Sequence, residues 1–131
     1  MATRSNIGYV TPKGTIRFVY CHWDGYFESL GRDLIKDFNS LKLAIDLVER
    51  GDMSYLDKSY ASMGDKWEMI KPREVKTIKE VCEEEFCYIY IPDFGWFGKE
   101  VWDDSVPFIS MEEPKELITH PFFLEGNLVS C

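Results

Sequence analysis

The sequence predicts an α+β domain in which an antiparallel sheet of four to five strands has two to three helices packed on one face. Short segments rich in aromatic and β-branched residues alternate with segments of helical period. The chain has 131 residues, 45% of them hydrophobic, which suits one core. No linker rich in Gly, Ser and Pro divides it. We therefore expect residues 1–131 to form a single domain, with 121–131 as an extended C-terminal tail.

The first two predicted strands span residues 6–10 and 15–23, on either side of the turn sequence TPKG. The second strand is apolar on both sides. Its alternation places Ile16, Phe18, Tyr20 and His22 on one face and Arg17, Val19, Cys21 and Trp23 on the other. A strand of this kind is expected inside the sheet, covered from two sides.

Two amphipathic helices are predicted over residues 27–38 and 41–50. Asn39 or Ser40 is suited to cap the second helix, and Gly51 is suited to end it. The connection between them is so short that the two helices must be neighbours.

The second half of the chain carries a further helix and a hairpin. Residues 52–71 lack a sustained period and predict a loop, with a short strand near 67–70. Pro72 is suited to start a helix over 73–82, and the acidic run 83–85 would be its solvated end.

FCYIYI at residues 86–91 is the strongest strand signal, and the turn PDFG returns the chain into a partner strand over 96–102. An exposed edge of this hairpin is a candidate surface for pairing into a homodimer. Ser110 and Glu113 resemble a capping box for a helix ending at Ile118.

The chain is acidic, with a formal net charge of −8. This charge disfavours direct binding to nucleic acid and to anionic membranes, both of which need clustered Lys and Arg. The N-terminus shows no signal peptide, and no segment approaches the ~20 apolar residues of a membrane span. The four cysteines form no C-x-x-C pair, so we expect reduced thiols in a cytoplasm, with no metal and no cofactor.

The heptapeptide YCHWDGY at residues 20–26 concentrates the reactive side chains of the chain. Strand alternation sends Cys21 and His22 to opposite faces, so Cys21 is expected to be a buried thiol. His22 and Asp24 share a face if the strand continues that far. They are the candidate catalytic residues, and three readings stay open: a structural clasp at the strand–helix junction, a ligand contact, or an acid–base pair.

Three motifs resemble a family of small, largely uncharacterised bacteriophage and prophage proteins: TRSNI, KGTIRFVYCHWDGY and LVERGDMSYL. The similarity covers Thr3–Ile7, Gly14–Tyr26, Gly31 and Leu47–Leu56. Phe27 replaces a frequent Pro of the family, and Lys13 replaces a frequent Asp. The family carries no settled activity, so the resemblance implies a phage origin and the host cell cytoplasm rather than a reaction.

Three functions follow from these observations. The first is a small acidic accessory protein, not an enzyme, that binds and modulates a host or phage macromolecule, above all a protein. Its contact surface would be an aromatic patch rimmed by acids, drawn from Tyr55, Tyr60, Trp67, Phe94, Trp96 and Phe97.

The second is a binder of a small nucleotide-like ligand near the heptapeptide. Arg4 and Arg17 would hold the phosphate, and the other contacts would come from Tyr20, His22, Trp23, Asp24 and Tyr26. The third is a small hydrolase or transferase that uses His22 and Asp24.

Overall fold

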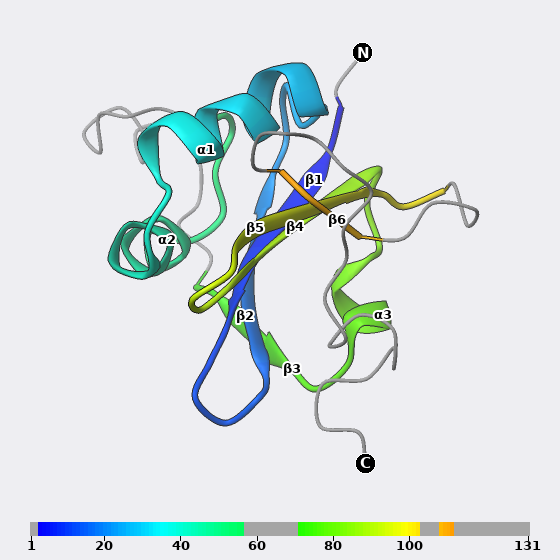
Figure 1. The fold of residues 1–131 in the computed structure, drawn as a ribbon. Helices are drawn as coiled ribbons and strands as arrows, with labels where there is room; N and C mark the ends of the chain where they lie inside the picture. Colours follow the sequence, from blue (N-terminus) through cyan, green and yellow to red (C-terminus); the bar gives the residue numbers. More distant parts are fainter. Residues whose placement is uncertain (1–2, 57–70, 103–107, 112–131) are drawn as a thin grey trace.

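Six strands form one mixed sheet in the order β3-β2-β1-β4-β5-β6 (Figure 1). The structure, a computed structural model, describes residues 3–56, 71–102 and 108–111. The strands are β1 (Ser5–Val10), β2 (Ile16–Cys21), β3 (Arg73–Val75), β4 (Phe86–Ile91), β5 (Gly95–Glu100) and β6 (Ile109–Ser110). The α+β class is confirmed, and the strand count is slightly higher than predicted.

One pair of strands departs from the antiparallel arrangement. β1 runs parallel to β4, whereas every other neighbouring pair is antiparallel. A parallel pair needs a crossover connection. Here β2 returns the chain to the end of the sheet where β1 begins, and β4 begins at that same end, with Phe86 beside Ser5.

Helices cover both faces of the sheet. They are η1 (Phe27–Gly31), a π-helical turn that runs directly into α1 (Arg32–Asp37), then α2 (Leu41–Val48) and α3 (Ile78–Val81). η1, α1 and α2 lie together on one face, as the sequence predicted, and the short α3 lies on the other (Figure 1).

The two faces of β2 explain the two cores. Val19 and Cys21 belong to the core beneath η1, α1 and α2, whereas Ile16 and Phe18 belong to the core beneath α3. The expected division of this strand into two apolar faces is therefore confirmed. Trp96 anchors the first core, and its indole Nε1 donates a 2.9 Å hydrogen bond to the carbonyl of Phe38.

Local signals correctly predict the start of α2, and the helix ends at Val48, two residues before the predicted end. The Ser40 hydroxyl accepts a 3.1 Å hydrogen bond from the amide of Leu43, which satisfies one of the amides left open in the first turn. Gly51 has φ 93°, in the left-handed region that ends many helices.

The helix predicted over 73–82 is wrong in its first half. Arg73–Val75 forms β3, which pairs with Ile16–Phe18 of β2, and the helix begins only at Ile78. Thr77 supplies the cap, since its hydroxyl accepts from the amide of Glu80 at 3.3 Å. Strand pairing with β2 overrides the local signal of Pro72. The acidic run 83–85 consequently lies in a bend after the helix, not at its end.

The 86–102 hairpin lies inside the sheet. β4 is paired on both sides, by β1 and β5, and β6 pairs with β5 at Phe97 and Gly98. The edges are β3 and β6, so the edge expected for a homodimer is not where the sequence placed it. Ser110 lies in β6.

Other predictions fall on parts of the chain that the structure does not describe. The strand near 67–70, the helix through Ile118 and the tail 121–131 lie outside the described residues. No helix within the described ranges is long and apolar enough to cross a membrane.

Candidate functional site

The heptapeptide leaves β2 and is held in place by the segment that follows α2. The amide of His22 donates to the carbonyl of Met53 at 3.1 Å, and the amide of Trp23 donates to the carbonyl of Ser54 at 2.9 Å. Cys21 forms a parallel bridge with Met53. These bonds fix the backbone beyond the end of β2, while the Trp23 side chain remains 43% exposed.

The junction turns at Asp24 and packs at Gly25. Asp24, and not the glycine, has the left-handed backbone, with φ 60°. Gly25 is instead required for a close approach, because a Cβ there would lie 2.8 Å from Ser5 and from the Thr3 carbonyl. Its amide donates to Thr3 at 2.9 Å, and its carbonyl accepts from the Tyr88 hydroxyl at 2.7 Å.

Cys21 is a structural thiol. Its side chain is fully buried, and burial raises the pKa of the Cys21 thiol to about 12. The Sγ lies 3.6 Å from the carbonyl of Trp23. Since the thiolate is the nucleophile, this cysteine is unsuited to nucleophilic catalysis.

His22 and Asp24 face different surroundings. The Nδ1 of His22 shares a 2.7 Å hydrogen bond with the Tyr20 hydroxyl, and its ring meets the Trp23 ring edge-on at 4.8 Å between centroids. Asp24 lines a small hollow beside η1, and His22 is not among the described residues that line this hollow.

Arg4 belongs to the side of the junction that carries Tyr20. Burial raises the pKa of Tyr20, the Glu84 carboxylate raises it further, and the Arg4 guanidinium acts in the opposite direction. The Arg4 amide also donates to Glu85 at 3.0 Å. Arg4 therefore lies near Glu84 and Glu85.

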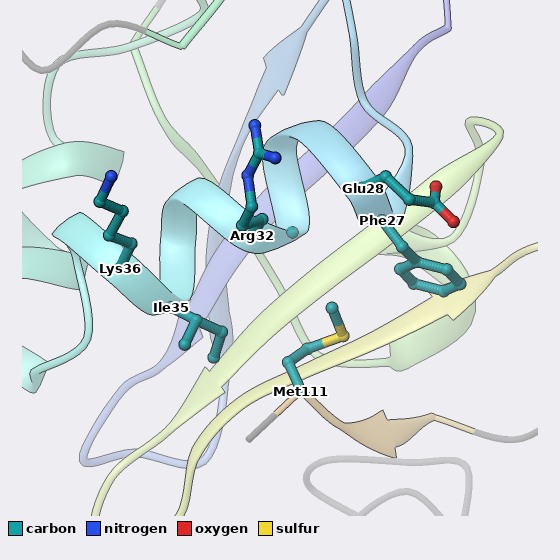
Figure 2. Close-up of a pocket in the computed structure, with 7 residues that line it drawn as sticks. Phe27, Glu28, Arg32, Ile35, Lys36 and Met111 are labelled. Carbon is teal, nitrogen blue, oxygen red and sulfur yellow. The ribbon is translucent and has the colours of Figure 1, made fainter. Parts of the chain in front are cut away.

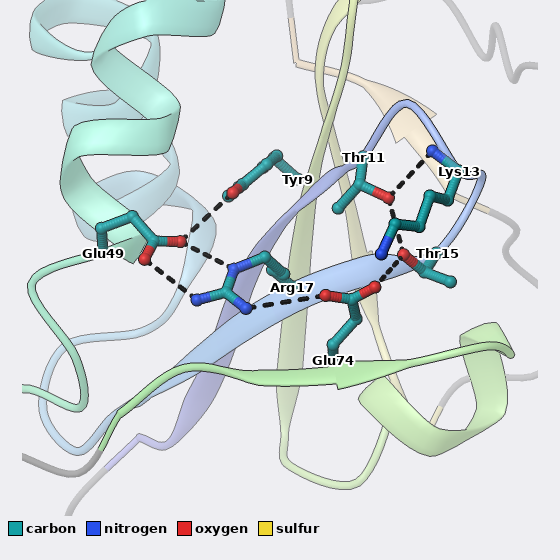
Figure 3. A network of polar contacts seen from close by, with 7 residues as sticks. All are labelled: Tyr9, Thr11, Lys13, Thr15, Arg17, Glu49 and Glu74. Carbon is teal, nitrogen blue, oxygen red and sulfur yellow. Dashed lines mark hydrogen bonds and ion pairs between the residues drawn. The ribbon is translucent and has the colours of Figure 1, made fainter.

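Arg17 belongs to a network at the other end of β2 (Figure 3). Its Nε and Nη2 donate to the two carboxylate oxygens of Glu49 at 2.8 and 2.9 Å, and its Nη1 lies 3.6 Å from Glu74. Glu49 also accepts from the Tyr9 hydroxyl at 3.2 Å, and Glu74 accepts from Thr15 at 2.7 Å. The structure thus separates Arg17 from Arg4 and from the other residues of the predicted ligand set.

We call the hollow at Asp24 the acidic notch. Its volume is about 100 Å³. It is lined by Trp23, Asp24, Ser29, Leu30, Asp33, Tyr55 and Leu56. Two carboxylates and two exposed aromatic side chains therefore meet there, from the end of β2, from the η1–α1 helix and from the segment after α2.

A second hollow, the apolar groove, lies on the other side of the same helix (Figure 2). Its volume is about 370 Å³. Phe27, Ile35 and Met111 point into it, and the charged ends of Arg32 and Lys36 extend away from Met111. The sequence analysis did not single it out, because it depends on contact between the helix and the end of β6.

The predicted aromatic contact surface is only partly exposed. Tyr55 and Phe94 are 44% and 58% exposed, but Trp96 and Phe97 are buried, because β5 is covered on both faces. Tyr60 and Trp67 lie outside the described residues. Trp23, Tyr26 and Trp102 are exposed instead, and alternation alone did not identify Trp102.

Comparison with protein-family models, with curated proteins and with solved structures gives no match. The resemblance to a phage family stays a prediction from the motifs. Within residues 3–56, 71–102 and 108–111, no three side chains of His, Cys, Asp or Glu form a group that would hold a metal ion.

Proposed function

We propose that this chain is a non-enzymatic accessory protein that binds and modulates a host or phage protein in the cytoplasm of the host cell. One observation carries the proposal. Trp23 and Tyr55, each more than two-fifths exposed, converge on the acidic notch. Exposed aromatic side chains beside a small hollow are typical of the residues that dominate the energetics of protein interfaces.

The aromatic surface is fixed in advance. The backbone of Trp23 is bonded to Ser54, and its ring is supported edge-on by His22. His22 is in turn held by the hydroxyl of Tyr20. Because these side chains are already ordered, a partner would lose little conformational entropy on binding them.

The geometry favours a protein partner over a nucleotide. Pockets for small ligands usually measure about 300–1,000 Å³, and the acidic notch is well below this range. Its two carboxylates would repel a phosphate. Arg17 is committed to Glu49, at the opposite end of β2 from Trp23.

The geometry gives little support to a hydrolase. Asp24 lines the notch, whereas His22 is bonded to Tyr20 on another side of the junction. An acid–base pair must reach the same reacting group.

Affinity capture from the lysate of a bacterial host tests the proposal. We expect wild type to enrich a protein that Trp23→Ala fails to enrich. Trp102→Ala is the matched control, because Trp102 is also an exposed tryptophan, at 75%, but lies away from the notch. It comes two residues after Glu100, and Glu100 is three strands from Cys21 in the sheet. The captured protein would then be purified and its affinity for the three chains measured. Equal affinity for wild type and Trp23→Ala would refute the proposal.

A further inference from the structure

The acidic notch and the apolar groove lie on opposite sides of the η1–α1 helix and differ in chemistry. The helix gives Ser29, Leu30 and Asp33 to the notch, and Phe27, Gly31 and Ile35 to the groove. Nothing in the structure indicates what would cover the groove. The notch, in contrast, has a charge that restricts its occupant.

The size of the notch suits the end of one side chain. A volume of about 100 Å³ corresponds to roughly three water molecules, at ~30 Å³ each. An ammonium or guanidinium group with one or two methylene groups occupies a space of this order. A whole helix or a nucleobase with its sugar does not fit.

The charge of the notch suits a cation. Asp24 and Asp33 both line it. The only ion pair found for Asp33 in the described part of the chain is with its neighbour Arg32, at 4.0 Å, and the Arg32 side chain is 72% exposed. The Asp24 carboxylate has no hydrogen bond or ion pair within the described residues. Two carboxylates in a confined hollow attract a positive group and exclude a negative one.

The aromatic walls suit the same occupant. Trp23 and Tyr55, both exposed, line the notch together with the two aspartates. Such rings pack against the methylene stem of a long basic side chain and attract its charged end. The formal net charge of −8 would also draw a basic partner toward this protein before contact.

We infer that the acidic notch receives a single Lys or Arg side chain from the bound protein, at the centre of the contact surface. This inference deepens the proposed function and rests on it. The partner is accordingly a protein with a basic residue that projects from its surface, and the aromatic rings around the notch bury the stem of that residue.

Three short peptides titrated into the full chain test the inference by amide chemical shifts in NMR. They are acetyl-Gly-Lys-Gly-amide, the Arg equivalent, and a control in which norleucine replaces Lys, with the same stem but no charge. We expect saturable shifts at Trp23, Asp24 and Tyr55 with the two basic peptides, and at least tenfold weaker binding of the norleucine peptide. Asp24→Asn combined with Asp33→Asn should weaken the Lys peptide about tenfold.

Glu28→Gln is the matched control, because this exposed acid lies on the groove side of the helix and should leave the affinity unchanged. If the double variant does not fold, Asp33→Asn alone should weaken binding about threefold. Equal binding of the Lys and norleucine peptides, or wild-type affinity in a folded double variant, would overturn the inference.

These outcomes are distinct from those of the capture experiment. Loss of a protein partner in Trp23→Ala, without charge-dependent peptide binding, would leave the proposed function intact and refute the cation subsite. Charge-dependent peptide binding, with a captured partner that binds Trp23→Ala as well as wild type, would support the cation subsite and refute the proposed function.

Discussion

The two ends of β2 use charged side chains in opposite ways. At one end, Arg17 donates to both carboxylate oxygens of Glu49 and approaches Glu74, so each charge has partners inside the protein (Figure 3). At the other end, Asp24 and Asp33 line the acidic notch together with Trp23 and Tyr55. The first arrangement ties β2 to α2 and β3, whereas the second leaves charge available to another molecule.

This difference separates stability from binding. Substitutions in the Arg17 network should lower the free energy of unfolding and leave partner affinity unchanged. Substitutions of the polar and aromatic side chains that line the notch, such as Trp23, Asp33 and Tyr55, should lower partner affinity and leave the free energy of unfolding nearly unchanged. The backbone of residues 22–26 is the exception. Its packing contributes to the free energy of unfolding, even though the side chains of Trp23, Asp24 and Tyr26 are exposed.

The largest effect is expected at the junction backbone. Gly25→Ala would place a methyl group 2.8 Å from Ser5 and from the Thr3 carbonyl, and the backbone there has little room to move. We expect the free energy of unfolding to fall by about 2–3 kcal/mol, measured by urea denaturation.

Gly31→Ala is the matched control for this substitution. Its methyl group would approach the terminal methyl of Met111 at 2.7 Å, and a flexible side chain end moves easily. We expect a change below about 1 kcal/mol, since alanine also favours the helix. Equal losses in the two variants would contradict the rigid contact assigned to Gly25.

The second effect separates backbone strain from charge at Asp24. A β-branched residue tolerates the left-handed φ of 60° poorly, so Asp24→Val should cost about 1–2 kcal/mol of stability. Asp24→Asn should stay within about 0.5 kcal/mol of wild type, because Asn adopts this conformation readily. Thermal and urea unfolding of both variants would check this. A similar loss in both variants would mean that the carboxylate itself stabilises the fold.

The third effect concerns the end of β2 that carries Arg17. Arg17→Met removes a bidentate ion pair whose partners are partly exposed, so we expect a loss of about 1 kcal/mol. Lys36→Met removes the same charge from an exposed site and serves as the control. Affinity for the captured partner should be unchanged in both. A loss of affinity in Arg17→Met alone would place the contact surface at the Arg17 end of β2 and contradict its assignment to the notch.

The smallest effect is the pH dependence of the same pair. The hydrogen bond from Arg17 lowers the pKa of Glu49 below its ordinary value of 4.5, against the opposing effect of burial. A carboxyl with a lowered pKa in the folded state stabilises the protein above its unfolded pKa, and this contribution is lost as the pH falls through the folded value.

The difference in unfolding free energy between wild type and Glu49→Gln should therefore be constant near neutral pH and shrink below about pH 4.5. Urea denaturation from about pH 7 to about pH 3.5 measures it. A difference that grows with acidity would contradict the assigned sign.

Local sequence signals predicted the parts of the fold that depend on local chemistry. The alternation in β2, the cap at Ser40 and the apolar run of β4 each act over a few residues, and all three are confirmed. β3 was missed because Arg73–Val75 is a strand only through its pairing with β2. No local pattern carries that information.

The sequence predicted only some of the residues of the notch, for the same reason. Trp23 and Asp24 stood out in the heptapeptide, and Ser29 and Asp33 share a helical face at a spacing of four residues. Their meeting with Tyr55 depends on the hydrogen bonds that hold Met53 and Ser54 against the end of β2. Likewise, no local pattern indicated that Glu49 would form an ion pair with Arg17.

Hydrogen exchange of the chain with and without its captured partner shows directly which end of β2 forms the contact surface. We expect slower exchange at residues 22–26 and 54–56 in the complex, and unchanged exchange around Arg17, Glu49 and Glu74. Protection confined to the Arg17 end of β2, or to the exposed Phe94 and Trp102, would contradict this expectation.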